Sequence, residues 1–173
     1  MQSLRCYHHW KLKICPAPKH TDSSDLWHLF IMQKLLIIAG IAGATAVIIG
    51  AFGSHGLAPH LSDSQMNTFD IASKYHFYHA LAILGMAVLY PYVTNKHWVN
   101  RAGYAFAIGI ILFSGSLYLL ACKDILQLGA FTKIIGPITP VGGLAFILGW
   151  FILLLSVRIN NASMRQCDNA SMR

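Results

Sequence analysis

Four apolar stretches, each long enough to cross a bilayer, constrain this chain of 173 residues more than any other feature. They cover roughly residues 35–53, 69–90, 102–122 and 141–157. A spanning helix needs about 20 mostly apolar residues to cross about 30 Å of hydrocarbon. The first, third and fourth stretches hold no charged side chain. The sequence therefore predicts an all-α polytopic membrane protein, with a bundle of four transmembrane helices within residues 32–158.

The composition agrees with a membrane protein, because 55% of the residues are hydrophobic and only 11% are charged. The net charge of +7 lies mainly in the terminal segments and one connection, with no aromatic-interleaved basic patch. We therefore expect the lipid bilayer as the environment and no nucleic-acid partner.

Lys and Arg favour the cytoplasmic side of a membrane. If four helices span, one side holds ten basic residues, namely Arg5, Lys11, Lys13, Lys19, Lys34, Lys96, Arg101, Arg158, Arg165 and Arg173, against Lys74, Lys123 and Lys133. Both termini are therefore predicted to be cytoplasmic.

The two ends of the chain differ in character from the apolar part between them. Residues 1–31 are polar and carry no targeting signature, and Met32 reads like a natural start of translation. We expect this extension to be disordered or non-native. Residues 159–173 form a short tail in which the sequence of 161–165 recurs as 169–173, a tandem duplication with no expected function. The four cysteines match no metal-site spacing, so no metal is predicted.

Small residues at helical spacing predict close packing of the first and fourth helices, because glycine lets two backbones approach. The predicted packing positions are Gly43, Gly50, Gly53, Gly142, Gly143 and Gly149. Thr139 suits the N-cap of the last helix and Pro140 its first position. Ser62 or Asp63 is a predicted cap in the connection before the second helix.

The second helix carries more polar side chains than the others. Asp70 and Lys74 are four residues apart with the acid first, which predicts an ion pair. His79 lies ten residues after Phe69, or about 15 Å along the axis. An imidazole at that depth is expected to face the bundle interior. His76 is expected nearer the helix entrance, towards the lipid, so that its replacement should cost less than that of His79.

Topology brings other polar groups to the level of His79 or just outside it. The predicted intramembrane cluster consists of His55, Tyr75, His79, Ser114, Tyr118 and Thr139. One interpretation is that these groups hydrogen-bond to one another and hold the helices together. The other is that they bind a ligand, a proton or haem.

Four ordered segments also resemble a known family. They are Gly50–Leu57 (GAFGSHGL), Tyr75–Leu84 (YHFYHALAIL), Phe113–Tyr118 (FSGSLY), and Thr139–Gly143 (TPVGG) followed by Gly149-Trp150. The chain is similar over about 126 residues to the small membrane proteins grouped as domain of unknown function 423. That resemblance implies a four-helix bacterial inner-membrane protein, with relatives in eukaryotic membranes, and it implies no activity. The terminal additions depart from the family pattern, as does Lys74, where many relatives would be expected to carry an acid.

Three classes of function fit these observations. The first is a non-enzymatic protein that packs against, assembles or regulates a partner, either a second copy or another membrane protein. The second is a small transporter or proton-linked carrier that uses His79 and Tyr75. The third is a haem or quinone protein, since two histidines on facing helices ligate iron in such proteins. No nucleophile elbow, phosphate loop or metal motif points to an enzyme. We adopt the first reading, with no cofactor expected and haem left open.

Overall fold

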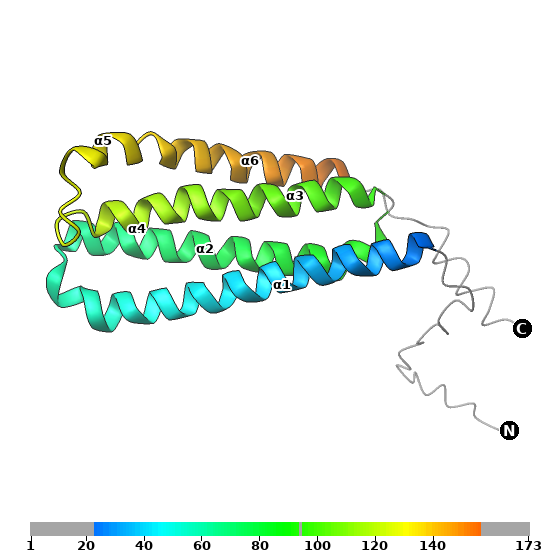
Figure 1. Cartoon of the computed structure of the whole chain (residues 1–173), viewed down its shortest axis with the longest axis horizontal. Coiled ribbons are helices and arrows are strands. Elements are labelled where there is room, and N and C mark those ends of the chain that lie inside the picture. The colour runs from blue at the N-terminus through cyan, green and yellow to red at the C-terminus, as the bar shows by residue number, and fades with distance from the viewer. Residues whose placement is uncertain (1–22, 94, 157–173) are drawn as a thin grey trace, which may run out of the picture.

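Four long helical segments lie side by side and run alternately in opposite directions (Figure 1). The computed structural model describes residues 23–93 and 95–156. The first two segments are α1 (Ser23–Phe52) and α2 (Asp63–Leu89). The third is continuous but changes its winding, from α3 (Lys96–Gly109) through the π-helical turn η4 (Ile110–Ser114) to α4 (Gly115–Ala121). The fourth is α6 (Ile138–Ser156).

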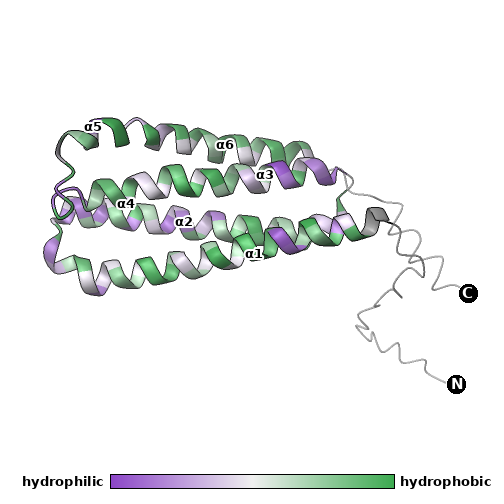
Figure 2. Ribbon diagram, viewed as in Figure 1, coloured by the Kyte–Doolittle hydropathy of each residue, from purple (hydrophilic) through white to green (hydrophobic). Residues whose placement is uncertain are grey.

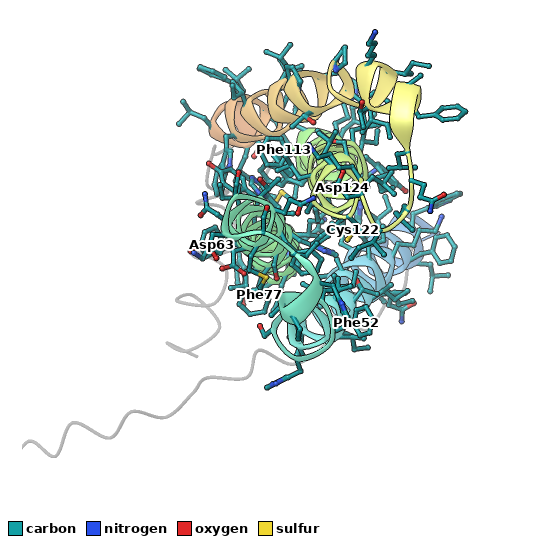
Figure 3. All side chains as sticks on the ribbon, turned by 90° about the vertical axis from the view of Figure 1, so that its left-hand side faces the viewer. Phe52, Asp63, Phe77, Phe113, Cys122 and Asp124 are labelled. Carbon is teal, nitrogen blue, oxygen red and sulfur yellow. The ribbon has the colours of Figure 1, made fainter. Side chains whose placement is uncertain are left out.

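Short helical turns make the connections. The turns η1 (Gly53–Leu57) and η2 (Ala58–His60) lead from α1 to α2, and η3 (Tyr90–Tyr92) leads towards α3. The turn η5 (Gly129–Phe131) and the single-turn helix α5 (Thr132–Ile135) precede α6. The start of α1 and the end of α6 lie at the same end of the bundle (Figure 1). Figure 3 looks along the bundle from the opposite end, where Asp63 starts α2 and Cys122 and Asp124 follow α4.

The outer surface of this bundle is that of a membrane protein. Three helical stretches among the described residues are long and apolar enough to span, and they are Leu26–His60, Lys96–Ala121 and Gly129–Ser156. The remaining segment, α2, has 27 residues and a length of about 40 Å. Figure 2 shows polar colour along its first half and apolar colour over most of α1 and α6. The predicted all-α fold with four helices is confirmed.

The apolar core joins all four segments. Leu35 of α1, Ile83 and Met86 of α2, Phe106 of α3 and Phe146 of α6 belong to one buried cluster. In Figure 1 the ribbons of α2 and α3 lie between those of α1 and α6. The polar helix α2 is therefore covered by its neighbours rather than by lipid alone.

Several helix ends differ from the sequence prediction. The first helix begins at Ser23 rather than near residue 35, so residues 23–31 of the predicted extension are helical. The last helix begins at Ile138, which places Thr139 and Pro140 inside its first turn rather than at the N-cap. Residues 1–22 and the duplicated tail lie outside the described residues.

The helix α2 begins at Asp63, before the predicted start at residue 69, because a cap forms at Ser62. Ser62 is the N-cap: its Oγ accepts from the Gln65 backbone N–H, and Gln65 Oε1 accepts from the Ser62 backbone N–H at 3.0 Å. This reciprocal capping box satisfies two backbone donors that a helix start leaves open. The Gln65 side chain also donates to Asp124 Oδ2 at 2.7 Å, which ties α2 to the connection after α4.

The glycines differ widely in the space around them. A methyl group on Gly142 would overlap the backbone of Leu112 and Phe113, so α6 and η4 approach through their main chains. Methyl groups on Gly53 and Gly149 would overlap the rings of Phe69 and Phe106. Among the other predicted packing positions, one on Gly50 would stand 3.0 Å from Ser73 Oγ, one on Gly143 would make ordinary contacts, and one on Gly43 would meet nothing within 4 Å. Gly103 and Gly109, which the sequence analysis did not single out, also face side chains too closely for a methyl group.

Candidate functional site

His79 lies in an aromatic environment between α2, α3 and α6. Its side chain is 6% exposed, and its ring stacks on that of Phe146 with centroids 3.5 Å apart and planes 9° apart. Phe106 and Trp150 contribute further rings, with centroids 5.3 and 6.3 Å away. The one hydrogen bond of His79 among the described residues joins Nδ1 to the Tyr75 carbonyl at 2.8 Å, one turn earlier on the same helix. A carbonyl only accepts, so Nδ1 carries the proton.

Tyr75 lies beside His79 but is not buried with it. Its side chain is 42% exposed, and its ring packs against Phe113 with centroids 4.9 Å apart. Its ring centroid lies 6.0 Å from that of His79, and the two rings are nearly parallel. The structure thus brings this predicted pair together by ring contact.

His76 is buried to the same degree as His79, with 6% of the side chain exposed. The expectation that it faces the lipid is wrong. Its Nε2 lies 3.4 Å from Thr45 Oγ1 of α1, and its Nδ1 lies 3.5 Å from the Tyr118 hydroxyl of α4. His76 of α2 therefore contacts both α1 and α4.

The hydrogen bonds around His76 define its tautomer. Thr45 already donates its hydroxyl proton to the Ile41 carbonyl at 2.8 Å, so Thr45 can only accept from the imidazole. Nε2 therefore carries the proton in the neutral ring, and Nδ1 accepts from the Tyr118 O–H. Both distances exceed the usual range of about 2.7–3.2 Å, so both bonds are weak.

An open groove lies directly over His76, between α1 and the third helical segment. It has a volume of about 410 Å³, within the range of about 300–1,000 Å³ typical of small-molecule sites. Its surface is almost wholly apolar. It is lined by Ile38, Ile41, Ala42, Thr45, Ile49, His76, Ala107, Ile110, Ile111, Gly115 and Tyr118. The π-helical turn η4 forms part of one wall, and such turns often occur at functional sites.

Thr139 and Ser114 lie elsewhere in the bundle. Thr139 Oγ1 is 2.7 Å from the hydroxyl of Ser116, which joins α6 to α4. Ser114 is fully buried in η4, and its hydroxyl has no partner within the described part of the chain. Of the six predicted cluster residues, Tyr75 and His79 are in ring contact. Tyr118 instead contacts His76, which was not part of the predicted cluster.

The remaining predicted residues lie towards the end with the 53–62 connection. His55 is exposed in η1, away from the aromatic environment of His79. Asp70 is half-buried and Lys74 is exposed, and these two described residues form no recorded ion pair. No group of three or more histidine, cysteine or acidic side chains comes together within the residues described.

The predicted cluster leaves out Thr45 and Ser116, and the prediction for His76 misses its burial. Thr45 is the single hydroxyl residue within the first apolar stretch, which is a usable signal. His76 precedes His79 by three residues, so the two share neighbouring positions on one helix face. Nothing comparable in the sequence indicates where the groove lies, because the groove depends on the distance between α1 and the helices α3 and α4.

The fold and these buried groups define a polytopic all-α membrane protein. Comparison with known proteins places it more narrowly. The model of the family described as "Protein of unknown function (DUF423)" matches residues 49–143. A UPF0382 membrane protein of Staphylococcus aureus is 43% identical over 72% of this chain and 95% of its own length. The UPF0382 inner membrane protein YgdD of Escherichia coli is 39% identical over 70% of this chain and 86% of its own, and YwdK of Bacillus subtilis is 37% identical over 72% and 96%.

The chain belongs to the DUF423 family, as its sequence motifs predicted. It is therefore an integral membrane protein of a family whose function is uncharacterised, and neither the fold nor the relatives indicate catalysis. No solved structure matches it.

Proposed function

We propose that this chain is a non-enzymatic membrane protein that acts through association with other molecules in the bilayer. The main support for this proposal is that its buried polar groups form contacts between helices. Ser116 and Thr139 join α4 to α6, and His76 stands between Thr45 and Tyr118. These groups hold helices together instead of converging on one polar centre. Such interhelical bonds contribute about 0.6–1.7 kcal/mol each.

The setting we propose is the plasma membrane of a bacterium, with both termini in the cytoplasm. The Escherichia coli relative YgdD is named an inner membrane protein, which supports the first point. The ten-to-three bias of basic residues supports the second, as does the position of the described ends of α1 and α6 at one end of the bundle. At that end Lys34, Lys96 and Arg101 stand over aromatic rings, a combination typical of a membrane interface.

The association partner is a second copy or another membrane protein. Large apolar side chains remain exposed along both outer helices, such as Ile48 on α1 and Leu154 on α6. We propose no cofactor for this function. Ligation of haem by His55 and His79 gains no support from the geometry, because His55 is exposed in η1 and His79 lies against Phe146.

A proton carrier that uses His79 is the competing function, and reconstitution separates the two. The full chain is placed in liposomes with a pH gradient and an internal pH dye. We expect the gradient to decay as slowly as in protein-free liposomes, because the hydrogen bond of His79 returns to its own helix. Faster decay in the wild type that His79→Phe abolishes would establish a carrier and overturn the proposal.

The same variants test the structural role of His79. In His79→Phe the new ring keeps the stack on Phe146, and the Tyr75 carbonyl remains within the α2 backbone ladder. The free energy of unfolding in detergent should therefore fall by about 1 kcal/mol or less. His79→Ala, the matched control, removes the ring and should cost about 2–5 kcal/mol.

A further inference from the structure

The groove over His76 has the features of a ligand site, although its polar residues also supply the contacts between helices on which the proposed function rests. Its walls are apolar, and the positions from Ile38 to Ile49 on α1 extend it over about 16 Å of helix axis. Polar groups occur at one part of it only, where His76, Thr45 and Tyr118 meet. We propose that this groove binds an isoprenoid quinone, with the quinone ring beside His76 and Tyr118 and the tail along α1 towards Ile38.

The polar end of the groove selects for a hydrogen-bond acceptor. His76 Nε2 carries a proton that its present acceptor, Thr45 Oγ1, holds only at 3.4 Å. The Tyr118 hydroxyl reaches His76 Nδ1 only at 3.5 Å. Either donor gains a shorter bond when a ligand carbonyl enters, since good N–H···O and O–H···O bonds are about 2.7–3.0 Å long. A carbonyl oxygen needs no donor in return, and because Nε2 and Nδ1 lie on opposite edges of the imidazole, a single carbonyl accepts from only one of the two donors.

The depth of the polar end favours a quinone over a phospholipid. Phe69 packs at Gly53, near the end of α1, and His76 lies seven residues further into the bundle, or about 10 Å. The charged headgroup and ester groups of a phospholipid belong to the interface, and a charge is costly inside the hydrocarbon. An uncharged quinone ring resides within the apolar layer, so it reaches His76 without moving a charge there.

The third helical segment keeps the groove open at Gly115. This glycine lines the groove directly after the π-helical turn η4, and a methyl group on it would meet nothing within 4 Å. We expect a larger side chain at this position to extend into the groove, because its Cβ starts in free space. Gly115→Leu is therefore a blocking variant. Gly40→Leu is its matched control, because Gly40 also has free space around it and does not line the groove.

The test uses the full chain in lipid nanodiscs prepared without quinone. The probe is decyl-ubiquinone, and the measurement is the quinone retained by protein-containing discs in excess of empty discs. We expect saturable excess binding by the wild type and by Gly40→Leu, and at least about tenfold weaker binding by Gly115→Leu. Tyr118→Phe keeps the ring and removes one donor, so its affinity should fall about three- to tenfold. Thermal unfolding of each variant verifies that it is folded.

A second probe distinguishes hydrogen bonding to the quinone carbonyls from nonspecific filling of the apolar groove. Decylbenzene has a similar tail and ring but no carbonyl, so it should bind at least about threefold more weakly than decyl-ubiquinone. Equal binding of the two probes would overturn the role given to His76 and Tyr118. Absence of saturable binding by the wild type, or equal binding by Gly115→Leu and Gly40→Leu, would overturn the site itself. These outcomes leave the association proposal untouched, because its test uses no quinone.

Discussion

Gly142 lies where the backbones of α6 and η4 approach each other closely. A Cβ atom there would stand 2.7 Å from Phe113 Cα, and the neighbouring atoms belong to the backbone rather than to a movable side chain. Gly143, the next residue, would place its Cβ 3.7 Å from the Phe113 ring, an ordinary contact. Two adjacent glycines in the same helical turn therefore have opposite packing constraints.

This difference predicts opposite effects for two alanine substitutions. Gly142→Ala should lower the free energy of unfolding by about 1–3 kcal/mol or more, because α6 must move away from η4. Gly143→Ala should leave it unchanged or raise it by up to about 1 kcal/mol, because alanine favours helix and contacts are ordinary here. Unfolding of both variants in one detergent measures the difference. If both lose the same stability, the close approach of α6 and η4 is disproved.

The burial of His76 was within reach of sequence analysis, although the lipid-facing prediction missed it. One row of buried positions on α2 alternates in steps of three and four residues. It consists of Phe69, Ala72, His76, His79, Ile83 and Met86, followed by Tyr90 just beyond the helix, and Ala80 and Ala87 are buried directly beside it. This heptad spacing marks the seam of packed helices. The polarity of His76 obscured the pattern, because a histidine counts against an apolar seam.

Among the elements, α2 is the one of the four long segments whose composition does not by itself mark a spanning helix, and it still runs the length of the bundle beside the others. From Phe69 to Leu89 it covers about 30 Å, the thickness of the hydrocarbon core. Its histidines are covered by α1, α3, α4 and α6, and the aliphatic stem of the exposed Lys74 lets its charge extend towards the interface. Polar residues on α2 are thus compatible with a spanning helix.

The hydrogen bond between Ser116 and Thr139 predicts a measurable coupling between α4 and α6. In a double-mutant cycle with Ser116→Ala and Thr139→Val, we expect a coupling energy of about 0.6 kcal/mol, with an upper bound of about 1.7 kcal/mol. Ser116→Ala combined with Ser62→Ala is the control, since Ser62 caps α2 and lies in a different network. The control pair should be additive. A coupling of zero between Ser116 and Thr139 would mean that the bond does not form in the folded protein.

The helices and their order followed from apolar runs alone, and their ends did not. The polar composition of residues 1–31 and the start-like Met32 assign residues 23–31 to an extension, yet α1 continues through them. The π-helical turn at Ile110–Ser114 has no distinct composition, because it lies inside a uniformly apolar stretch. The candidate cluster was predicted by depth in the membrane, whereas the structure separates its members by helix face.

At the scale of the whole molecule, the account requires α2 to cross the membrane. With both termini proposed to be cytoplasmic, we expect the 53–62 and 122–137 connections outside and the 90–95 connection in the cytoplasm. Burial raises the pKa of the native Cys122 thiol, so this residue would react slowly with a labelling reagent at neutral pH. Introduced cysteines at exposed sites on either side of α2 report topology more clearly.

Labelling of two single cysteines in intact bacterial cells shows whether α2 crosses the membrane. The four native cysteines are first replaced by serine, and Ser64→Cys and His97→Cys are then made separately, both at exposed positions. The account predicts that a membrane-impermeant maleimide labels Ser64→Cys in intact cells, and labels His97→Cys only after the membrane is permeabilised. Labelling of both residues in intact cells, or of neither before permeabilisation, would place both ends of α2 on one side and contradict a four-helix span.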